Sequence, residues 1–202
     1  MTPVAKAWST DQGFEIASTG VQVHGGMGYI EETGAAQYLR DARITMIYEG
    51  TNGIQSLDLV RRKLPREIAA TNRLFDQIQE TIQKMLSSDD MSLTATANQL
   101  ETAFYALQKA TEWIRTTVSR NPEVAASGAT QYCKMFGVVA AGWLLGKGAL
   151  QANSNLENRG FSDRKKITAQ FFAEQHLAPA AALLAPIISA GDTTLSLDPE
   201  EI

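Results

Sequence analysis

The chain has 202 residues, of which 18 are Lys or Arg and 22 are Asp or Glu, so its formal net charge is −4. This length fits one large domain or two small ones with a substantial core, and the charge balance gives no electrostatic reason to expect binding to nucleic acid or to an anionic membrane surface. A single cysteine, Cys133, excludes an internal disulfide, and one Cys with two His residues, His24 and His176, offers no set of zinc ligands, so no metal site is expected.

The start of the chain, MTPVAKAWSTDQGFE, lacks the basic and then apolar pattern of a signal peptide. The most apolar window, residues 135–146, is shorter than the roughly 20 residues needed to span a bilayer. Low cysteine usage suits a reducing compartment. The sequence therefore predicts a cytoplasmic protein without a membrane-spanning segment.

The first 64 residues show helical periodicity. Apolar residues recur at helical spacing from Pro3 to about Val23, and the glycines at 25–28 are expected to end that helix. A second helix is expected after Thr33, followed by a connector at residues 43–48 (RITMIY). Thr51 or Asn52 is expected to cap a third helix, and Gln55 is placed to close a capping box on Asn52. Proline 65 is expected to interrupt it.

After residue 65 the sequence predicts a helical bundle. One amphipathic helix carries Phe75 to Met85, and the next repeats apolar residues every seven positions, an a/d seam formed by Leu93, Leu100, Leu107 and Ile114. Asn121–Pro122 begins a third helix that ends near 153–155, and Ser162 is expected to cap a fourth, kinked at Pro179 and closing at Gly191. The predicted fold is all-α: a helical segment 1–64, a four-helix-bundle-like unit 65–191 and a polar tail 192–202.

The stretch IYEGT places one acid, Glu49, at the end of an apolar run. On spacing alone such a glutamate is most often a solvated surface residue. If Met46, Ile47 and Tyr48 enclosed it, burial would disfavour the charged form of the carboxylate. The carboxylate would then accept a proton more readily, as a general base near neutral pH must. The stretch GGMG lacks phosphate-loop spacing and follows a helix, so by itself it indicates only a helix stop.

Two separated stretches, VQVHGGMGYIEE at 21–32 and LRDARITMIYEGTNGIQ at 39–55, together resemble the C-terminal segment of acyl-CoA dehydrogenases over about the first 64 residues. The resemblance implies that Glu49 is the catalytic base in α,β-desaturation of an acyl-CoA thioester: it removes a proton from Cα while a hydride leaves Cβ for FAD. It also implies that the backbone N–H of Glu49 donates to the developing enolate oxygen, and that Tyr48 helps to wall the acyl cavity.

The same resemblance assigns cofactor contacts. It implies that Gln22 and Gly26 contact the adenosine-diphosphate half of an FAD held mainly by the neighbouring subunit, and that Thr51 lies near the flavin. The family often has Gln two residues after this threonine, where this chain has Gly53, so one side-chain contact is absent.

The stretch KKITAQFFAEQHLAPAAALLAPI at 165–187 resembles the extra C-terminal helical domain of larger acyl-CoA dehydrogenases, including the group acting on methylthiopropionyl-CoA. The alternative is a helical interaction or DNA-binding module, related to the alkylation-response member of the family and without dehydrogenase activity. After residue 64 there are 12 basic and 15 acidic residues, and the only basic run is RKK at 164–166. This balance disfavours binding to duplex DNA.

The family's N-terminal helical domain and flavin-holding β-domain do not appear in these 202 residues. We therefore expect a portion of a larger enzyme that is inactive alone and does not retain FAD. The resemblance implies acyl-CoA as substrate and an electron-transferring flavoprotein as partner. Uncovered apolar side chains in the first 64 residues, with Phe14, Val21 and Tyr38 as candidates, also predict a homodimer or larger assembly.

Overall fold

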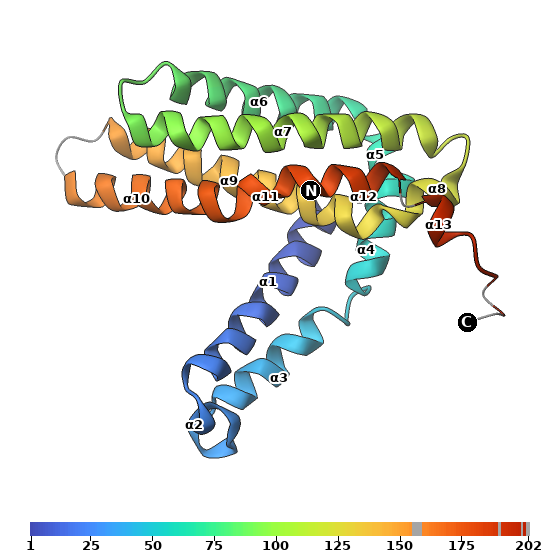
Figure 1. Cartoon of the computed structure of the whole chain (residues 1–202), viewed down its shortest axis with the longest axis horizontal. Coiled ribbons are helices and arrows are strands. Elements are labelled where there is room, and N and C mark those ends of the chain that lie inside the picture. Colours follow the sequence, from blue (N-terminus) through green and yellow to red (C-terminus); the bar gives the residue numbers. More distant parts are fainter. Residues whose placement is uncertain (155–158, 190, 199, 201–202) are drawn as a thin grey trace.

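The computed structural model describes residues 1–154, 159–189, 191–198 and 200, and over these residues the chain is built from helices without a β-strand. This confirms the all-α prediction. Figure 1 shows two parts: a bundle of long, nearly parallel or antiparallel helices, and an arm that leaves the bundle at a steep angle.

The bundle has four rows of helix. Three are single helices: α6 (Ile68–Leu86), α7 (Met91–Thr117) and α9 (Ala129–Asn153). The fourth row comprises α10 (Arg159–Phe172), a π-helical segment (Ala173–Leu177), α11 (Ala178–Ala180), a 3-10 turn (Ala181–Leu183) and α12 (Leu184–Ser189). Two short helices, α8 (Pro122–Ser127) and α13 (Gly191–Thr194), pack together at one end (Figure 1).

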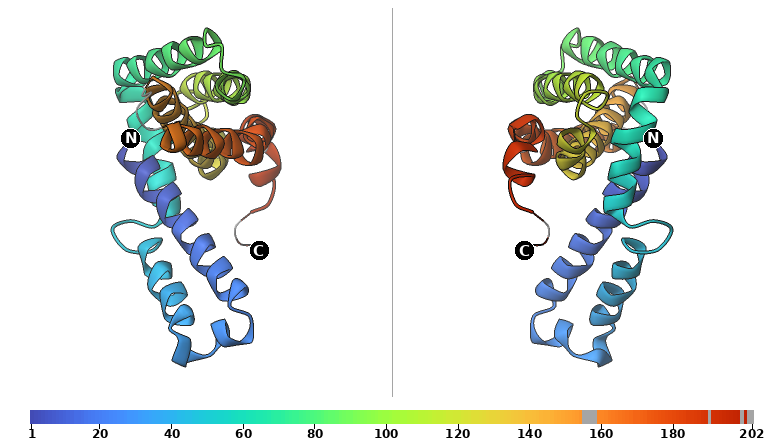
Figure 2. Two further views of the ribbon diagram at one scale, coloured as in Figure 1. Left: turned by 90° about the vertical axis from the view of Figure 1, so that its left-hand side faces the viewer. Right: turned by 90° about the vertical axis from the view of Figure 1, so that its right-hand side faces the viewer.

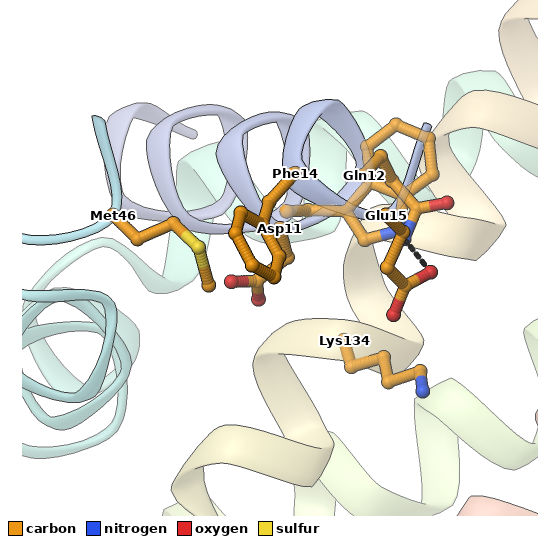
Figure 3. A pocket seen from close by; sticks show the side chains of 7 residues that line it. Asp11, Gln12, Phe14, Glu15, Met46 and Lys134 are labelled. Carbon is orange, nitrogen blue, oxygen red and sulfur yellow. Dashed lines mark hydrogen bonds between the residues drawn. The ribbon is translucent and has the colours of Figure 1, made fainter. Parts of the chain in front are cut away.

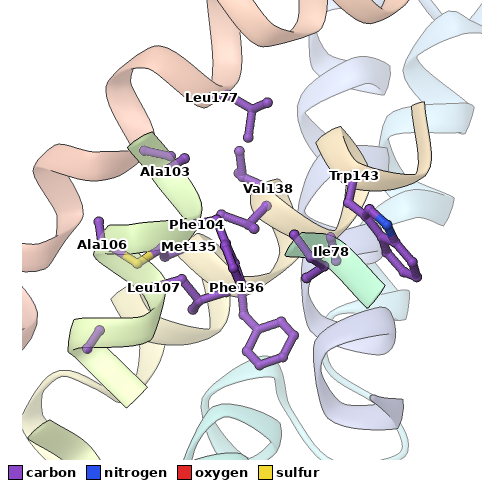
Figure 4. Packing of buried hydrophobic residues seen from close by; sticks show 14 of the residues in the cluster. Ile78, Ala103, Phe104, Ala106, Leu107, Met135, Phe136, Val138, Trp143 and Leu177 are labelled. Carbon is purple, nitrogen blue, oxygen red and sulfur yellow. The ribbon is translucent and has the colours of Figure 1, made fainter. Parts of the chain in front are cut away.

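The seam predicted from the heptad spacing forms the centre of the bundle. Each of its four residues on α7 is fully buried (Leu93, Leu100, Leu107 and Ile114). Aromatic rings pack beside them: Phe75 of α6 meets Phe104 of α7 edge-on at 5.2 Å between ring centroids. Figure 4 shows Phe104 and Leu107 among the buried side chains of this core. Two polar pairs lie within this core: the Trp143 indole N–H donates to the Thr81 hydroxyl at 2.9 Å, and the Thr111 and Tyr132 hydroxyls lie 2.8 Å apart. The heptad prediction is thus confirmed.

The arm is a helical hairpin whose base docks on the bundle. Its helix α1 (Thr2–Val23) runs outward, α2 (Gly26–Tyr29) and a 3-10 turn (Glu31–Thr33) form the tip, and α3 (Ala35–Thr45) returns. Helix α4 (Asn52–Asp58) then leads through a π-helical segment (Leu59–Lys63) and α5 (Leu64–Arg66) into the bundle. Figure 2 shows the hairpin standing clear of the bundle from both sides.

Only the base of α1 is buried in this chain. Its buried residues are Pro3, Val4 and Ala7, and α3 has none. Of the three residues expected to be uncovered, Tyr38 is 74% exposed, whereas Phe14 and Val21 are partly buried. Phe14 is partly covered because the Arg43 guanidinium lies 5.4 Å from its ring centroid.

Several predicted helix boundaries were wrong in the first third of the chain. Arg43 to Thr45 belong to α3 and not to a connector. The Gln55 side chain donates to the Glu49 carbonyl at 3.0 Å, so it does not close a capping box on Asn52. The glycine stretch does end α1, but Gly26 begins a short helix of its own.

The chain continues in helix past Pro65, which was expected to interrupt its helix, and past Pro179, which was expected to kink one. Pro65 and Pro179 each follow a five-residue π-helical segment. In both segments the N–H of the residue before the proline donates five residues back, as in the bond from Leu64 to Leu59. This wider turn accommodates a residue that has no N–H to donate. The helix that contains Pro65 ends at Arg66, and Glu67 follows as its C-cap.

Three further boundaries in the bundle differ from the prediction. Gly128 separates α8 from α9. The backbone of α12 lies so close to Gly128 that a Cβ there would be 2.7 Å from the Ile187 carbonyl oxygen. Ser162 lies inside α10 and is buried, so it is not its cap. Helix α13 extends into the predicted polar tail as far as Thr194. Residues 199, 201 and 202 of that tail, and residue 155 of the predicted helix end, lie outside the described residues.

Two described stretches, residues 129–153 and 159–189, are long and apolar enough to cross a membrane by length and composition. The first is mostly buried because it is the central helix of the bundle, and the second is mostly outside the core. The absence of a membrane-spanning segment and the cytoplasmic location therefore stay predictions.

Candidate functional site

The loop between α3 and α4 holds Glu49 in an unusual backbone conformation. Glu49 has φ of 55° and is the one non-glycine residue with positive φ in the part of the chain that the structure describes; Gly50 follows with φ of 82°. A left-handed conformation is uncommon for a residue with a Cβ, and it persists only where surrounding contacts hold it. Two consecutive residues of this kind turn the chain sharply at the base of the arm.

Side chains from two different helices hold this loop through its carbonyl groups. Gln55 of α4 donates to the Glu49 carbonyl at 3.0 Å, and the Lys6 ammonium of α1 donates to the Gly50 carbonyl at 2.9 Å. The Thr51 hydroxyl accepts from the Ile54 N–H at 3.3 Å, which confirms Thr51 as the cap of α4. Within the described chain the Glu49 N–H donates to no acceptor, so it is available to a ligand.

A second group of contacts ties α4 to α1 just beside the loop. The Asn52 side-chain nitrogen donates to the Asp11 carboxylate at 2.6 Å and to the Thr10 hydroxyl at 2.9 Å. The Asn52 side-chain oxygen accepts from Lys6 at 2.7 Å. Sequence reasoning missed Lys6 and Asp11, because their partners lie more than forty positions away. Their signal in the sequence is slight: a lysine and an acid on adjacent turns of one helix.

The carboxylate side of Glu49 opens to solvent. Glu49 is exposed, and Ile47 and Tyr48 are 47% and 51% exposed, so the apolar wall expected from residues 46–48 does not form in this chain. A hollow of about 430 Å³ lies beside Glu49, and it is lined by Thr2, Pro3, Gly50, Ile54, Gln55, Asp58, Arg62 and Lys63. The walls of this hollow therefore come from α1, α4 and the π-helical segment, and its remaining side is open.

Of the three residues expected to contact FAD, only Thr51 lies beside Glu49. Gln22 and Gly26 are exposed at the tip of the arm, whereas Thr51 and Glu49 lie at its base. Gln22 is about 16 residues along α1 from Lys6, or roughly 24 Å at 1.5 Å per residue. A Cβ on Gly26 would meet nothing within 4 Å, so bare backbone is open to an approaching group at the tip. Within one chain, Gln22 and Gly26 therefore lie far from Glu49 and Thr51.

A separate, smaller hollow of about 120 Å³ lies where the arm meets the bundle (Figure 3). Asp11, Gln12 and Glu15 of α1 line one side, and Lys134 of α9 lies opposite (Figure 3). None of its lining residues belongs to the hollow beside Glu49. The described residues bring together no group of three or more His, Cys, Asp or Glu side chains that could hold a metal ion.

Comparison with known protein families matches nearly the whole chain in two parts. The family model described as Acyl-CoA dehydrogenase, C-terminal domain, matches residues 1–64. The one described as Acetyl-CoA dehydrogenase C-terminal like matches residues 74–198.

Individual relatives agree with these matches. The 3-methylmercaptopropionyl-CoA dehydrogenase of Ruegeria pomeroyi is 38% identical over 97% of this chain and 34% of its own length. The broad-specificity linear acyl-CoA dehydrogenase FadE5 of Mycobacterium tuberculosis is 28% identical over 88% of this chain and 31% of its own. Butyryl-CoA dehydrogenase of Syntrophomonas wolfei is 43% identical over 30% of this chain and 10% of its own. The chain therefore spans about a third of the length of the first two relatives, and it belongs to the acyl-CoA dehydrogenase family.

Proposed function

We propose that this chain is the C-terminal, base-carrying portion of a FAD-dependent acyl-CoA dehydrogenase, and that Glu49 removes the Cα proton of an acyl-CoA thioester. The observation that supports this most is the loop itself. Glu49 occupies a left-handed turn held from two helices, its carboxylate is accessible, and its N–H has no acceptor among the described residues. Sparsely populated backbone conformations of this kind cluster at active sites and ligand contacts.

The proposed chemistry uses two groups of one residue. The Glu49 carboxylate accepts the proton from Cα, and the Glu49 N–H donates to the thioester oxygen, on which negative charge develops as that proton leaves. FAD, when bound, supplies the acceptor for the hydride that leaves Cβ. The hollow beside Glu49, which Ile54 and Thr2 help to line, gives the reacting part of the substrate a place next to the base.

The separation of the predicted FAD contacts supports an oligomer. Gln22 and Gly26 lie roughly 24 Å along α1 from the loop anchor at Lys6, so in one chain they are remote from Glu49. We propose that they contact the cofactor of a neighbouring subunit, while Glu49 and Thr51 serve the subunit's own site. The exposed Tyr38 on the arm, 74% accessible, fits a surface covered by another subunit or by the rest of the enzyme.

The remaining roles follow from the same family membership. We propose acyl-CoA as the substrate, an electron-transferring flavoprotein as the electron acceptor, and two structural units, 1–64 and 65–191. The bundle does not favour the alternative of a DNA-binding module. Its basic run at 164–166 is partly neutralised, because Lys166 pairs with Asp90 at 2.8 Å and with Asp163 at 3.3 Å.

Replacement of Glu49 by Gln tests the proposal in the full-length, flavin-loaded protein. Glu49→Gln keeps the shape of the side chain and the backbone N–H but cannot accept a proton. We expect flavin reduction by acyl-CoA to slow by at least the roughly 10²–10⁴-fold typical of general-base loss. Glu101→Gln, at an exposed position on α7, is the matched control and should reduce flavin at the normal rate. Near-normal flavin reduction by Glu49→Gln would overturn the assignment.

A further inference from the structure

Lys6 is the point at which α1 and the Glu49 loop are joined. Its ammonium group donates to the Gly50 carbonyl at 2.9 Å and to the Asn52 side-chain oxygen at 2.7 Å. Both acceptors are more than forty residues from Lys6 in the sequence, and they lie at the two ends of the turn that follows Glu49. A single cationic side chain therefore fixes both ends of the short segment from Gly50 to Asn52.

The Asn52 side chain is itself held in one orientation. Its nitrogen donates to the Asp11 carboxylate at 2.6 Å, which turns its oxygen toward Lys6. The Thr10 hydroxyl donates to the Lys6 carbonyl at 2.8 Å and accepts from the Asn52 nitrogen at 2.9 Å. Each member of this cluster thus has its partners, and satisfied polar networks of this kind rigidify the segments that they join.

The conformation of the loop needs such an anchor. Glu49 and Gly50 both have positive φ, and a Cβ on Gly50 would lie 3.1 Å from the Gln55 side-chain nitrogen. The Gln55 contact holds the Glu49 carbonyl, but it comes from the helix that the loop itself begins. Lys6 supplies the one charged contact to a loop carbonyl from outside this segment in the described chain. Charge-assisted hydrogen bonds are the stronger kind, so this contact is the main external restraint.

We propose that Lys6 is a positioning residue for Glu49: through the Gly50 carbonyl and Asn52 it keeps the loop in the left-handed turn that aims the base and its N–H at the substrate. Lys6 itself touches no reacting atom. This inference rests on the proposed function for its catalytic consequence, whereas the anchoring of the loop can be tested without any activity.

The first test measures amide hydrogen exchange across residues 46–55 in the full-length protein. Lys6→Met removes the ammonium and keeps most of the apolar stem. Loss of the anchor should raise exchange at Asn52, whose N–H donates to the Met46 carbonyl, by about tenfold. Lys6→Arg, which restores a cationic donor, should recover part of the protection. Lys84→Met makes the same substitution in an exposed pair on α6 and should leave this segment unchanged.

The second test measures the rate of flavin reduction by acyl-CoA in the same variants. We expect Lys6→Met to lower the maximal rate by about 10–100-fold with less than about threefold change in KM, because a displaced base harms the reaction more than binding. Lys84→Met should match the wild type. Unchanged exchange in Lys6→Met would overturn the anchoring, and unchanged rates with faster exchange would overturn the positioning role.

Failure of the proposed function is distinguishable from failure of this inference. If Glu49→Gln reduces flavin as fast as the wild type, the assignment of the base is wrong, whatever Lys6 does. If Glu49→Gln is slow and Lys6→Met behaves like Lys84→Met in both measurements, Glu49 remains the base and the role given to Lys6 is wrong.

Discussion

Substitution of Gly137 by Ala should push the arm away from the bundle. A Cβ on Gly137 would lie 2.3 Å from Trp8 Cγ and 2.6 Å from Trp8 Cβ and Cδ1. These atoms are the Cβ of Trp8 and the adjoining edge of its rigid indole ring, not a flexible end, and both residues lie within long helices. The added methyl group therefore cannot be accommodated by a rotamer change alone, so α1 must shift against α9.

The magnitude follows from two opposing effects. Overpacking of a close helix contact costs about 1–3 kcal/mol, and replacing a helical glycine by alanine returns about 0.5–1 kcal/mol. We expect Gly137→Ala to lower the free energy of unfolding by about 1–2 kcal/mol net. For a chain of this length each kcal/mol corresponds to roughly 2–4 °C in Tm. Urea titration followed by circular dichroism and by tryptophan fluorescence measures the loss.

The same helix offers a matched control. A Cβ on Gly148 would meet nothing within 4 Å, and this residue is exposed. Gly148→Ala should therefore raise the free energy of unfolding by about 0.5–1 kcal/mol, the opposite sign for the same substitution in α9. Removing the obstruction with Trp8→Ala should make Gly137→Ala neutral or stabilising in that background. If Gly137→Ala stabilises the otherwise unchanged chain, the close packing of α1 on α9 is wrong.

Two further predictions concern polar contacts in the bundle. Burial opposes ionisation of Asp90, but the hydrogen bonds that it accepts from Lys166 and from two backbone N–H groups outweigh burial and lower its pKa. The resulting stabilisation is fully present above the ordinary carboxyl pKa and is lost as the pH falls through the lower pKa of the folded state. Asp90→Asn should therefore lower the free energy of unfolding by about 1.5 kcal/mol at pH 7, and by progressively less in acid. Urea unfolding at a series of pH values measures this loss. Thr81→Val should destabilise the chain by about 1–3 kcal/mol, because it leaves the buried Trp143 N–H without its acceptor; Thr102→Val, at an exposed hydroxyl on α7, is the control, and equal losses for the two would contradict this reasoning.

The features that the sequence predicts well depend on local spacing. The heptad from Leu93 to Ile114 gives a buried seam because residues seven apart return to the same side of a helix. Thr51 and Asn121, both expected at helix starts, each accept a hydrogen bond from a backbone N–H three residues along the chain, so the residue type and its position almost determine the contact. The family resemblance likewise depends on short stretches whose residues are read directly.

The features that sequence reasoning missed depend on contacts between distant segments. Pro65 predicts an interruption by the ordinary rule, yet the preceding π-helical turn carries the chain past it. The apolar wall around Glu49 was expected from its neighbours in sequence, but Ile47 and Tyr48 lie largely exposed in this chain. The walls that do form include Pro3 and Lys63, which no local pattern connects to Glu49.

The base of α1 links the site to the bundle through two contacts made within one turn of helix. Trp8 packs directly on Gly137 of α9, whereas Lys6 holds the Gly50 carbonyl and Asn52. A helix transmits a shift along its length because its backbone hydrogen bonds keep neighbouring turns in register. A displacement of Trp8 therefore also moves the ammonium group that holds the Glu49 loop. The position of the proposed base is thus set partly by the packing of α9, a helix of the bundle, against α1, although the bundle contributes no residue to the hollow beside Glu49.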